Sequence, residues 1–251
     1  MKTKKFITGL LISLFIFSPF LNFESMALHS PATLLAMGDI DDDGRDDLIG
    51  LRDDGLWVKY SRTNTWAKLA SPTTIISLGD IDGIGRDYLI GSWGSGSAPG
   101  TYYRNSVTGA WVRVGTPALK LASGDLDGDG RDDILGQWSD GIWVRYSASG
   151  VWKKLSSTLA TSIAAGDMDG DGRVDLLASF PNDGTYFRNS LTGEWVKMAS
   201  PASFIFAEDQ NGDGIDDLIG HWPDGLWVKY MGGAWSKITG TLPAWWGNVS
   251  N

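Results

Sequence analysis

An acidic loop recurs five times along this chain at nearly constant spacing. Each copy is a variant of Asp-x-Asp-x-Asp-Gly-x-x-Asp. The copies begin at Asp39, Asp80, Asp125, Asp167 and Asp209, so successive loops are 41, 45, 42 and 42 residues apart. A period maintained over most of a 251-residue chain indicates one repeated structural unit rather than several unrelated domains.

Each unit reads as four short strands. In the first unit, residues 33–37 precede the acidic loop, residues 47–51 follow it, and residues 56–60 and 66–69 complete the unit. Four strands in about 42 residues is the period of a propeller blade, and the 3.6-residue periodicity of helical solenoids is missing. The sequence therefore predicts an all-β fold, a β-propeller of about five four-stranded blades, as a single domain over residues 28–251.

The blades are of two types, and the pattern restarts after the fifth. Units one, three and five carry Gly-(Leu/Ile)-Trp-Val-(Lys/Arg)-Tyr, whereas units two and four carry Gly-Thr-Tyr-(Tyr/Phe)-Arg-Asn-Ser. Residues 242–246 then resemble residues 200–204, at the start of unit five. We expect this tail to meet the N-terminal strand near Leu34 and to help close the ring.

The N-terminus has the features of a secretory signal peptide. Lys2, Lys4 and Lys5 precede an apolar stretch, and small residues follow at 25–27, so residues 1–27 are predicted to be cleaved. The alternative is a membrane anchor, but the apolar stretch is short for a span. We expect a secreted or periplasmic protein with no stable membrane insertion after cleavage. Cysteine is absent, so disulfides cannot reinforce the fold.

The charge of the chain excludes some partners. The formal net charge is −9, and removal of residues 1–27 makes it −11. A surface this acidic repels nucleic acid and anionic lipid and attracts cations, so no nucleic-acid partner is expected.

The acidic loops are predicted to bind about four structural Ca²⁺ ions. Carboxylates at alternate positions of a tight loop converge on one point, and an oxygen-only cluster of flexible geometry suits Ca²⁺. The candidate ligands are Asp39, Asp41, Asp43, the Arg45 carbonyl and Asp47; Asp125, Asp127, Asp129, Arg131 and Asp133; Asp167, Asp169, Asp171, Arg173 and Asp175; and Asp209, Asn211, Asp213, Ile215 and Asp217. Loop two has Ile84 and Tyr88 at two ligand positions, so we expect it to have lost its metal.

Two other interpretations of these loops were weighed. An EF-hand needs a glutamate at the twelfth position, which here is Gly50, Gly91, Gly136, Ala178 or Gly220. The aspartates could also be ordinary polar turn residues, but four adjacent carboxylates without a cation repel one another strongly.

The loops, their strand context and their spacing resemble the FG-GAP and VCBS-type repeats of integrin α-subunits and bacterial secreted proteins. The resemblance covers roughly residues 31–246. It implies a propeller with Ca²⁺ in its blade loops and a role in adhesion or ligand binding, and the family includes propeller lectins.

Aromatic residues at the turn between the second and third strands are candidate ligand contacts. Trp93, Trp138 and Trp222 stand there beside variable polar neighbours that include His221. Tryptophans and tyrosines also recur in the third and fourth strands, and in all five units the fourth-strand tryptophan is followed two residues later by Lys or Arg. Platforms for sugar rings and packing between blades are both compatible with this recurrence.

These features favour a secreted recognition module rather than an enzyme. The leading hypothesis is a lectin-like propeller that binds a glycan, and the alternative is an adhesion or scaffold propeller that binds an extracellular protein. An enzyme active on polysaccharide is a third hypothesis. Only His29 and His221 could serve as a histidine base, and no nucleophile-elbow motif is present.

Overall fold

Five four-stranded antiparallel sheets make up the molecule. The computed structural model describes residues 33–240, in which every regular element is a strand, and no helix long and apolar enough to cross a membrane occurs among them. The predicted signal peptide (1–27) and the tail at 242–246 lie outside the described residues. The strands are β1 (Thr33–Gly38), β2 (Asp47–Arg52), β3 (Gly55–Tyr60) and β4 (Thr65–Ala70) in blade one; β5 (Ile76–Gly79), β6 (Tyr88–Trp93), β7 (Gly100–Arg104) and β8 (Trp111–Gly115) in blade two; β9 (Lys120–Gly124), β10 (Asp133–Trp138), β11 (Gly141–Arg145) and β12 (Trp152–Ser156) in blade three; β13 (Ser162–Gly166), β14 (Asp175–Phe180), β15 (Gly184–Arg188) and β16 (Trp195–Ala199) in blade four; and β17 (Phe204–Glu208), β18 (Asp217–Trp222), β19 (Gly225–Lys229) and β20 (Trp235–Thr239) in blade five.

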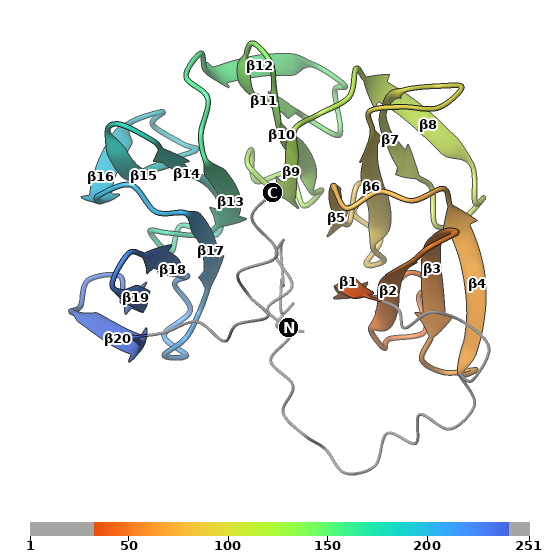
Figure 1. The fold of residues 1–251 in the computed structure, drawn as a ribbon, viewed down its shortest axis with the longest axis horizontal. Coiled ribbons are helices and arrows are strands. Elements are labelled where there is room, and N and C mark those ends of the chain that lie inside the picture. The colour runs from red at the N-terminus through yellow and green to blue at the C-terminus, as the bar shows by residue number, and fades with distance from the viewer. Residues whose placement is uncertain (1–32, 241–251) are drawn as a thin grey trace.

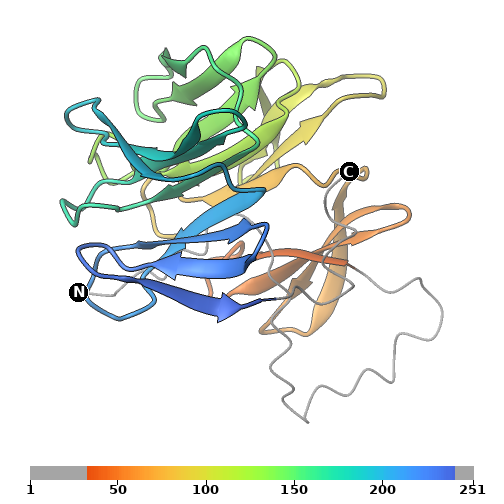
Figure 2. The same cartoon turned by 60° about the vertical axis from the view of Figure 1, so that its left-hand side comes forward.

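The five sheets are arranged around one axis as a propeller. In each sheet the strands pair in chain order, so the first strand is innermost and the fourth lies at the rim (Figure 1). Seen from the second direction, the blades are twisted sheets stacked against one another (Figure 2). The predicted all-β propeller of five blades is confirmed, and the strand bounds predicted in blade one agree with the structure to within one residue.

The hydrophobic cores lie between blades rather than within them. Every residue of the second strands β10 and β14 is buried, because both faces of these strands pack against neighbouring sheets. One cluster joins Leu135 and Val144 of blade three to Leu176 and Ala178 of blade four, and similar clusters join blades two with three and four with five. The fourth strands at the rim are only partly buried. A blade therefore depends on its neighbours for much of its apolar burial.

A pair of hydrogen bonds fixes the start of three acidic loops, in blades one, two and four, to the next blade. The Asp80 N–H donates to Oδ2 of Asp132 (2.8 Å), and the Asp132 N–H donates to the Asp80 carbonyl oxygen (2.8 Å). We call this exchange the clamp. Two further clamps join Asp39 with Asp87 and Asp167 with Asp216. At the junction of blades three and four, Val174 replaces the aspartate and only its N–H bond to the Asp125 carbonyl oxygen (2.8 Å) remains.

Blades five and one flank a seam in the ring. The residue of blade one that corresponds to Asp132 is Asp46, which is exposed and makes no hydrogen bond to Asp209 within residues 33–240. The innermost strands of successive blades pack against one another: β1 on β5, β5 on β9, β9 on β13 and β13 on β17. The described parts of β17 and β1 do not make comparable contacts with each other. The expected contact of residues 242–246 with Leu34 involves residues that the structure does not describe.

Candidate functional site

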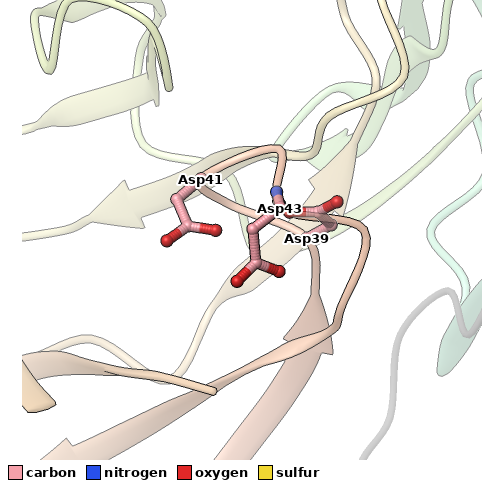
Figure 3. Close-up of side chains that lie close together, drawn as sticks. All are labelled: Asp39, Asp41 and Asp43. Atoms are coloured by element: carbon pink, nitrogen blue, oxygen red, sulfur yellow. Dashed lines mark hydrogen bonds between the residues drawn. The ribbon is translucent and has the colours of Figure 1, made fainter. Parts of the chain in front are cut away.

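The acidic loops converge their carboxylates because of a tight, glycine-dependent turn. The backbone is left-handed at the sixth position of every loop, which is Gly44, Gly85, Gly130, Gly172 or Gly214. Only glycine adopts this conformation without steric cost. In loop one, Asp39 accepts hydrogen bonds from the N–H groups of Asp43 (3.1 Å) and Gly44 (2.9 Å), which folds the loop back over its first carboxylate. Figure 3 shows the side chains of Asp39, Asp41 and Asp43 gathered on one side of this loop.

Three of the four predicted metal loops bring three carboxylates together. In each group, one oxygen per residue lies within 4.8 Å of the others. The groups are Asp39, Asp41 and Asp43; Asp125, Asp127 and Asp133; and Asp167, Asp169 and Asp175. These three clusters could hold a metal ion. The predicted ligands Asp47, Asp129 and Asp171 are outside these carboxylate groups. The residues predicted to contribute carbonyl oxygens are Arg45, Arg131 and Arg173. Their main-chain N–H groups donate to the third aspartate of the same loop.

The last aspartate of each loop is buried and bonded to the main chain. Asp133 is completely buried, and its two oxygens accept from the N–H groups of Leu126 (3.1 Å) and Ser147 (2.8 Å). Burial is the main cause that raises the pKa of Asp133 to about 7; the Ser147 hydrogen bond opposes this rise, and the nearby Asp127 carboxylate adds to it. Asp175 is bonded in the same way, and its pKa is also raised to about 7 by burial. A cation beside these carboxylates would favour their charged form.

The donor set of the loops fits a hard cation. Within residues 33–240, the carboxylate oxygens that are buried without a hydrogen-bond partner are Asp43 Oδ2, Asp127 Oδ1 and, in loop two, Asp82 Oδ1. Burial raises the pKa of Asp127, and the neighbouring carboxylates of Asp129 and Asp125 raise it further. Unpaired carboxylate oxygens held near other carboxylates carry a large desolvation and repulsion cost, which an oxygen-seeking divalent ion would offset.

Loop two has a phenol at its last ligand position, and one of its two Asp82 carboxylate oxygens is bonded to it. The Tyr88 hydroxyl, at the last ligand position, donates to Asp82 Oδ2 (2.6 Å) and accepts from Nδ2 of Asn105 (2.9 Å). A phenol thus supplies a hydrogen bond where the other loops have a carboxylate. This geometry agrees with the expectation that loop two has lost its metal, which stays a prediction.

Loop five has an amide in place of one carboxylate. Asn211 Nδ2 donates to Asp213 Oδ2 (3.0 Å), and the Ile215 N–H donates to Asp213 Oδ1 (2.9 Å). Asp217 is completely buried and accepts from the N–H groups of Gln210 and Met231, as the last aspartates of the other loops do with their neighbours. Loop five therefore has the same main-chain hydrogen bonds to its last aspartate as the other metal loops, with one carboxylate fewer.

Two cavities lie at alternate blade junctions and have equivalent linings. The first has a volume of about 650 Å³ between blades four and five, where Trp222, Asp224, Trp227 and Trp235 line it. The second has a volume of about 360 Å³ between blades two and three, with the corresponding lining residues Trp138, Asp140, Trp143 and Trp152. In each case the last strand of the preceding blade forms the other wall.

The same polar arrangement is built in both cavities. Trp143 Nε1 donates to Asp140 Oδ1 (3.1 Å), and Lys154 Nζ lies 3.2 Å from Asp140 Oδ2 and 5.1 Å from the centre of the Trp143 ring. In the other cavity, Trp227 Nε1 donates to Asp224 Oδ1 (3.1 Å), and Lys237 Nζ lies 3.6 Å from Asp224 and 5.1 Å from the Trp227 ring. Each cavity is therefore lined by indole rings and a carboxylate, and a lysine outside the lining pairs with that carboxylate and lies over the third-strand indole.

The tryptophans predicted from the sequence form the back of these cavities. Trp138 and Trp222 are only 8% and 7% exposed, and their indole N–H groups donate to Thr116 and Ser200 carbonyl oxygens of the preceding blade (2.9 Å each). Each packs edge-to-face on a fourth-strand tryptophan, Trp152 or Trp235. Trp93 is the equivalent residue of blade two and packs on Trp111 at 5.2 Å. These rings hold blades together, and their contact with a ligand stays a prediction.

The more accessible aromatic residues of the cavities belong to the recurring third-strand aromatics, for which the sequence left sugar platforms and packing between blades both open. Trp143 and Trp227 are half-buried, and each stands three residues after an aspartate and opposite a fourth-strand lysine. The recurring Asp-Gly-(Leu/Ile)-Trp motif was the available signal, but only the sheet register shows that its lysine partner covers the same ring. Blade one has the motif as well, but there Arg52 lies over Trp57 and Trp66, at 4.8 and 4.3 Å, in the position of the cavity tryptophan.

His221 lies away from the cavities. Its ring stacks on Phe204 with a centre-to-centre distance of 5.4 Å, and its Nδ1 is 2.8 Å from Ser203 Oγ. Burial lowers the pKa of His221. Among the described residues, no carboxylate hydrogen-bonds to the ring, so a Ser-His-Asp arrangement is not assembled around it.

The comparisons with known proteins support the repeat and the fold. Residues 125–178, which span the acidic loops of blades three and four, match the sequence model of the FG-GAP-like repeat family. This match confirms the resemblance seen in the sequence. No curated protein sequence matches the chain.

Two solved structures share the propeller architecture at low sequence identity. One is an Agrocybe aegerita lectin described for its specific recognition of non-reducing terminal N-acetylglucosamine (TM-score 0.57, 16% identity, 86% of this chain and 68% of the lectin chain). The other is BBS1N in complex with ARL6DN (TM-score 0.55, 14% identity, 82% of this chain and 66% of that chain). The chain thus spans about two thirds of the length of these proteins. At this level of identity the likeness shows a shared propeller fold.

Proposed function

We propose that this chain is a secreted, calcium-binding propeller that recognises carbohydrate through the two equivalent inter-blade cavities. The observation that carries the proposal is the repetition of one indole face, one carboxylate and one ammonium group at both junctions. Sugar rings offer an apolar face for stacking and hydroxyl groups for hydrogen bonds, and these cavities offer partners for both.

Two similar sites on one rigid ring favour polyvalent ligands. Cavities of this size admit one or two sugar units, so binding at each is expected to be weak. Simultaneous engagement of both cavities by a branched or surface-bound glycan raises the overall affinity by the effective concentration of the second site. The Agrocybe aegerita lectin is an instance of the same architecture with a sugar ligand.

Calcium has a structural role in this proposal. The carboxylates of loops one, three, four and five would hold about four ions and would thereby neutralise like charges at the blade junctions. Because clamps join Asp39 of loop one and Asp167 of loop four to the next blade, an ion that fixes either loop also fixes that junction. We further propose that the chain acts without catalysis and reaches the cell exterior or periplasm through the signal peptide.

A glycan-binding screen in Ca²⁺ tests the proposal, with terminal N-acetylglucosamine structures among the probes. The wild type is expected to bind a coherent set of glycans. The double variant Trp143→Ala/Trp227→Ala is expected to bind at least tenfold more weakly, because a central aromatic contact contributes about 2 kcal/mol.

Trp57→Ala is the matched control for this screen. Trp57 has the same Asp–Lys partners, Asp54 and Lys68, but Arg52 lies over its ring. Its replacement is expected to leave binding unchanged. Equal loss in the control and the double variant, or absence of glycan binding by folded wild type, would rule out the cavities as sugar sites.

A specific surface feature favours a protein ligand as the second candidate. Val107 and Leu191 occupy the same turn position in blades two and four and are 57% and 62% exposed. An exposed aliphatic side chain at the same turn of two blades would give a protein ligand two apolar contact points. Substitution of both by Ser would weaken capture of a protein partner without affecting glycan binding.

A further inference from the structure

Side chains near the ends of the second strands fasten blades two, three and four to the entry segment of the next blade. Gln137 donates from Nε2 to the Ala160 carbonyl oxygen (3.1 Å) and accepts at Oε1 from the Ala160 N–H (2.6 Å). Ser92 makes the same two bonds to Ala118, and Ser179 makes them to Ala202. The alanine is always seven residues before the first aspartate of the next acidic loop. We call this pair of bonds the fastener.

Blade five has a fastener side chain but no described partner for it. His221 occupies the position of Gln137 in the strand pairing, and within residues 33–240 it contacts only its own blade, through Ser203 and Phe204. One repeat length after Ala202 the sequence has Ala244, preceded by Pro243 as Ala202 is preceded by Pro201. Residues 242–250 therefore contain the entry segment that His221 would fasten.

Blade five has an apolar face on the side of the seam. Its residues correspond to those with which other blades pack against the blade that follows them. Ile219, Leu226 and Val228 form a buried cluster with Phe204, Phe206 and Tyr230. The corresponding residues of blade three, Leu135, Ile142 and Val144, share their cluster with blade four. Among the residues that the structure describes, the cluster of blade five contains no residue of blade one, and no clamp joins Asp46 and Asp209.

We propose that residues 242–250 dock on blade five as the innermost strand of a sixth position in the ring. The His221 side chain binds the main chain of Ala244, as Gln137 binds Ala160. In the alignment of the repeats, Val249 corresponds to Ala207, and Ala207 packs on the preceding blade. Asn248 corresponds to Phe206, which faces away from the preceding blade. The segment directly follows β20, so its high effective concentration favours this docking over that of a second copy.

Hydrogen–deuterium exchange of the full chain tests this docking. Amides of residues 245–250 are expected to exchange at least tenfold more slowly than those of an unstructured peptide of the same sequence. His221→Ala is expected to remove most of this protection, because the fastener is lost. His221→Gln should retain it, because glutamine makes the same fastener in blade three.

A pair of adjacent charge substitutions gives the matched control. Val249→Asp places a carboxylate against the apolar face of blade five and is expected to abolish protection of residues 245–250. Asn248→Asp adds the same charge on the opposite side of the strand and should leave protection unchanged. Unprotected amides in the wild type, protection that depends on protein concentration, or equal effects of the two substitutions would overturn the proposal.

Discussion

At the scale of single residues, the clamp aspartates connect metal loops to neighbouring blades. Asp132 is 3% exposed, and its carboxylate accepts the hydrogen bond of the Asp80 N–H, which is also buried. A buried N–H that loses its acceptor costs the desolvation energy of that group. Asp46 has the same place in the repeat but is exposed and makes no clamp in the described structure.

Replacement of these two aspartates should therefore have unequal effects. Asp132→Ala is expected to lower the free energy of unfolding by about 1–3 kcal/mol, since it leaves the Asp80 N–H without its acceptor. Asp46→Ala is expected to change it by no more than about 0.5 kcal/mol, as for other exposed positions. Denaturant unfolding in the presence of Ca²⁺ measures both values. A large loss at Asp46 would show that blades five and one form a clamp in solution.

The glycines of the second strands show what sequence reasoning missed at this scale. A Cβ at Gly136 would lie 2.7 Å from the Trp138 ring, and the same conflict exists between Gly220 and Trp222. In blade four, where Phe180 replaces the tryptophan, Ala178 replaces the glycine. These positions were used in the sequence only to exclude an EF-hand. Their physical reason is the large indole that folds back over them, which spacing alone does not reveal.

At the scale of the elements, the strands were predictable and the sites only partly so. Alternating side chains and turn residues fixed the strands of blade one, because a half-buried or fully buried sheet imposes that pattern locally. The convergence of Asp39, Asp41 and Asp43 followed from the loop sequence for the same local reason. The inter-blade cavities were not predictable, because they depend on which lysine pairs across the sheet with which tryptophan and on the wall contributed by another blade.

The buried aspartates that end the loops predict an unusual pH dependence of the metal-free protein. The folded-state pKa values of Asp133 and Asp175 are about 7, above the ordinary value of 3.8, because burial disfavours the charged form. Their contribution to stability is therefore fully present below about pH 4 and is lost as pH rises through about 7. The melting temperature of metal-free protein is expected to fall between pH 5 and pH 8.

Calcium and an amide substitution provide the two controls for this pH dependence. Ca²⁺ binds the charged carboxylates, so saturating Ca²⁺ should abolish the fall or reverse it. The variant Asp133→Asn/Asp175→Asn cannot titrate at these positions and should show a flatter profile without metal. A metal-free wild type whose melting temperature rises from pH 5 to pH 8 would contradict the prediction.

At the scale of the whole molecule, shared cores make the five blades one cooperative unit. Each of three apolar clusters contains residues of two successive blades, so a blade cannot unfold without exposing the face of its neighbour. The acidic loops lie at these same junctions, and the clamps join them to the next blade. Ions bound at separate loops should therefore stabilise a single unfolding transition rather than individual blades.

This coupling predicts a steep dependence of stability on calcium concentration. For sites that bind only the folded state, each ion adds about 1.4 kcal/mol for every tenfold rise in Ca²⁺ above its dissociation constant, so four ions add about 5–6 kcal/mol. Extracellular calcium modules bind with dissociation constants of about 10⁻⁴–10⁻³ M, so titration from 0.1 to 30 mM covers the range. Asp127→Asn in loop three is expected to reduce the limiting slope by about a quarter. Asp82→Asn, in the loop where Tyr88 donates to the aspartate, should leave the slope unchanged. A single transition whose slope corresponds to one ion, or equal slopes for both variants, would contradict four structural sites coupled through the ring.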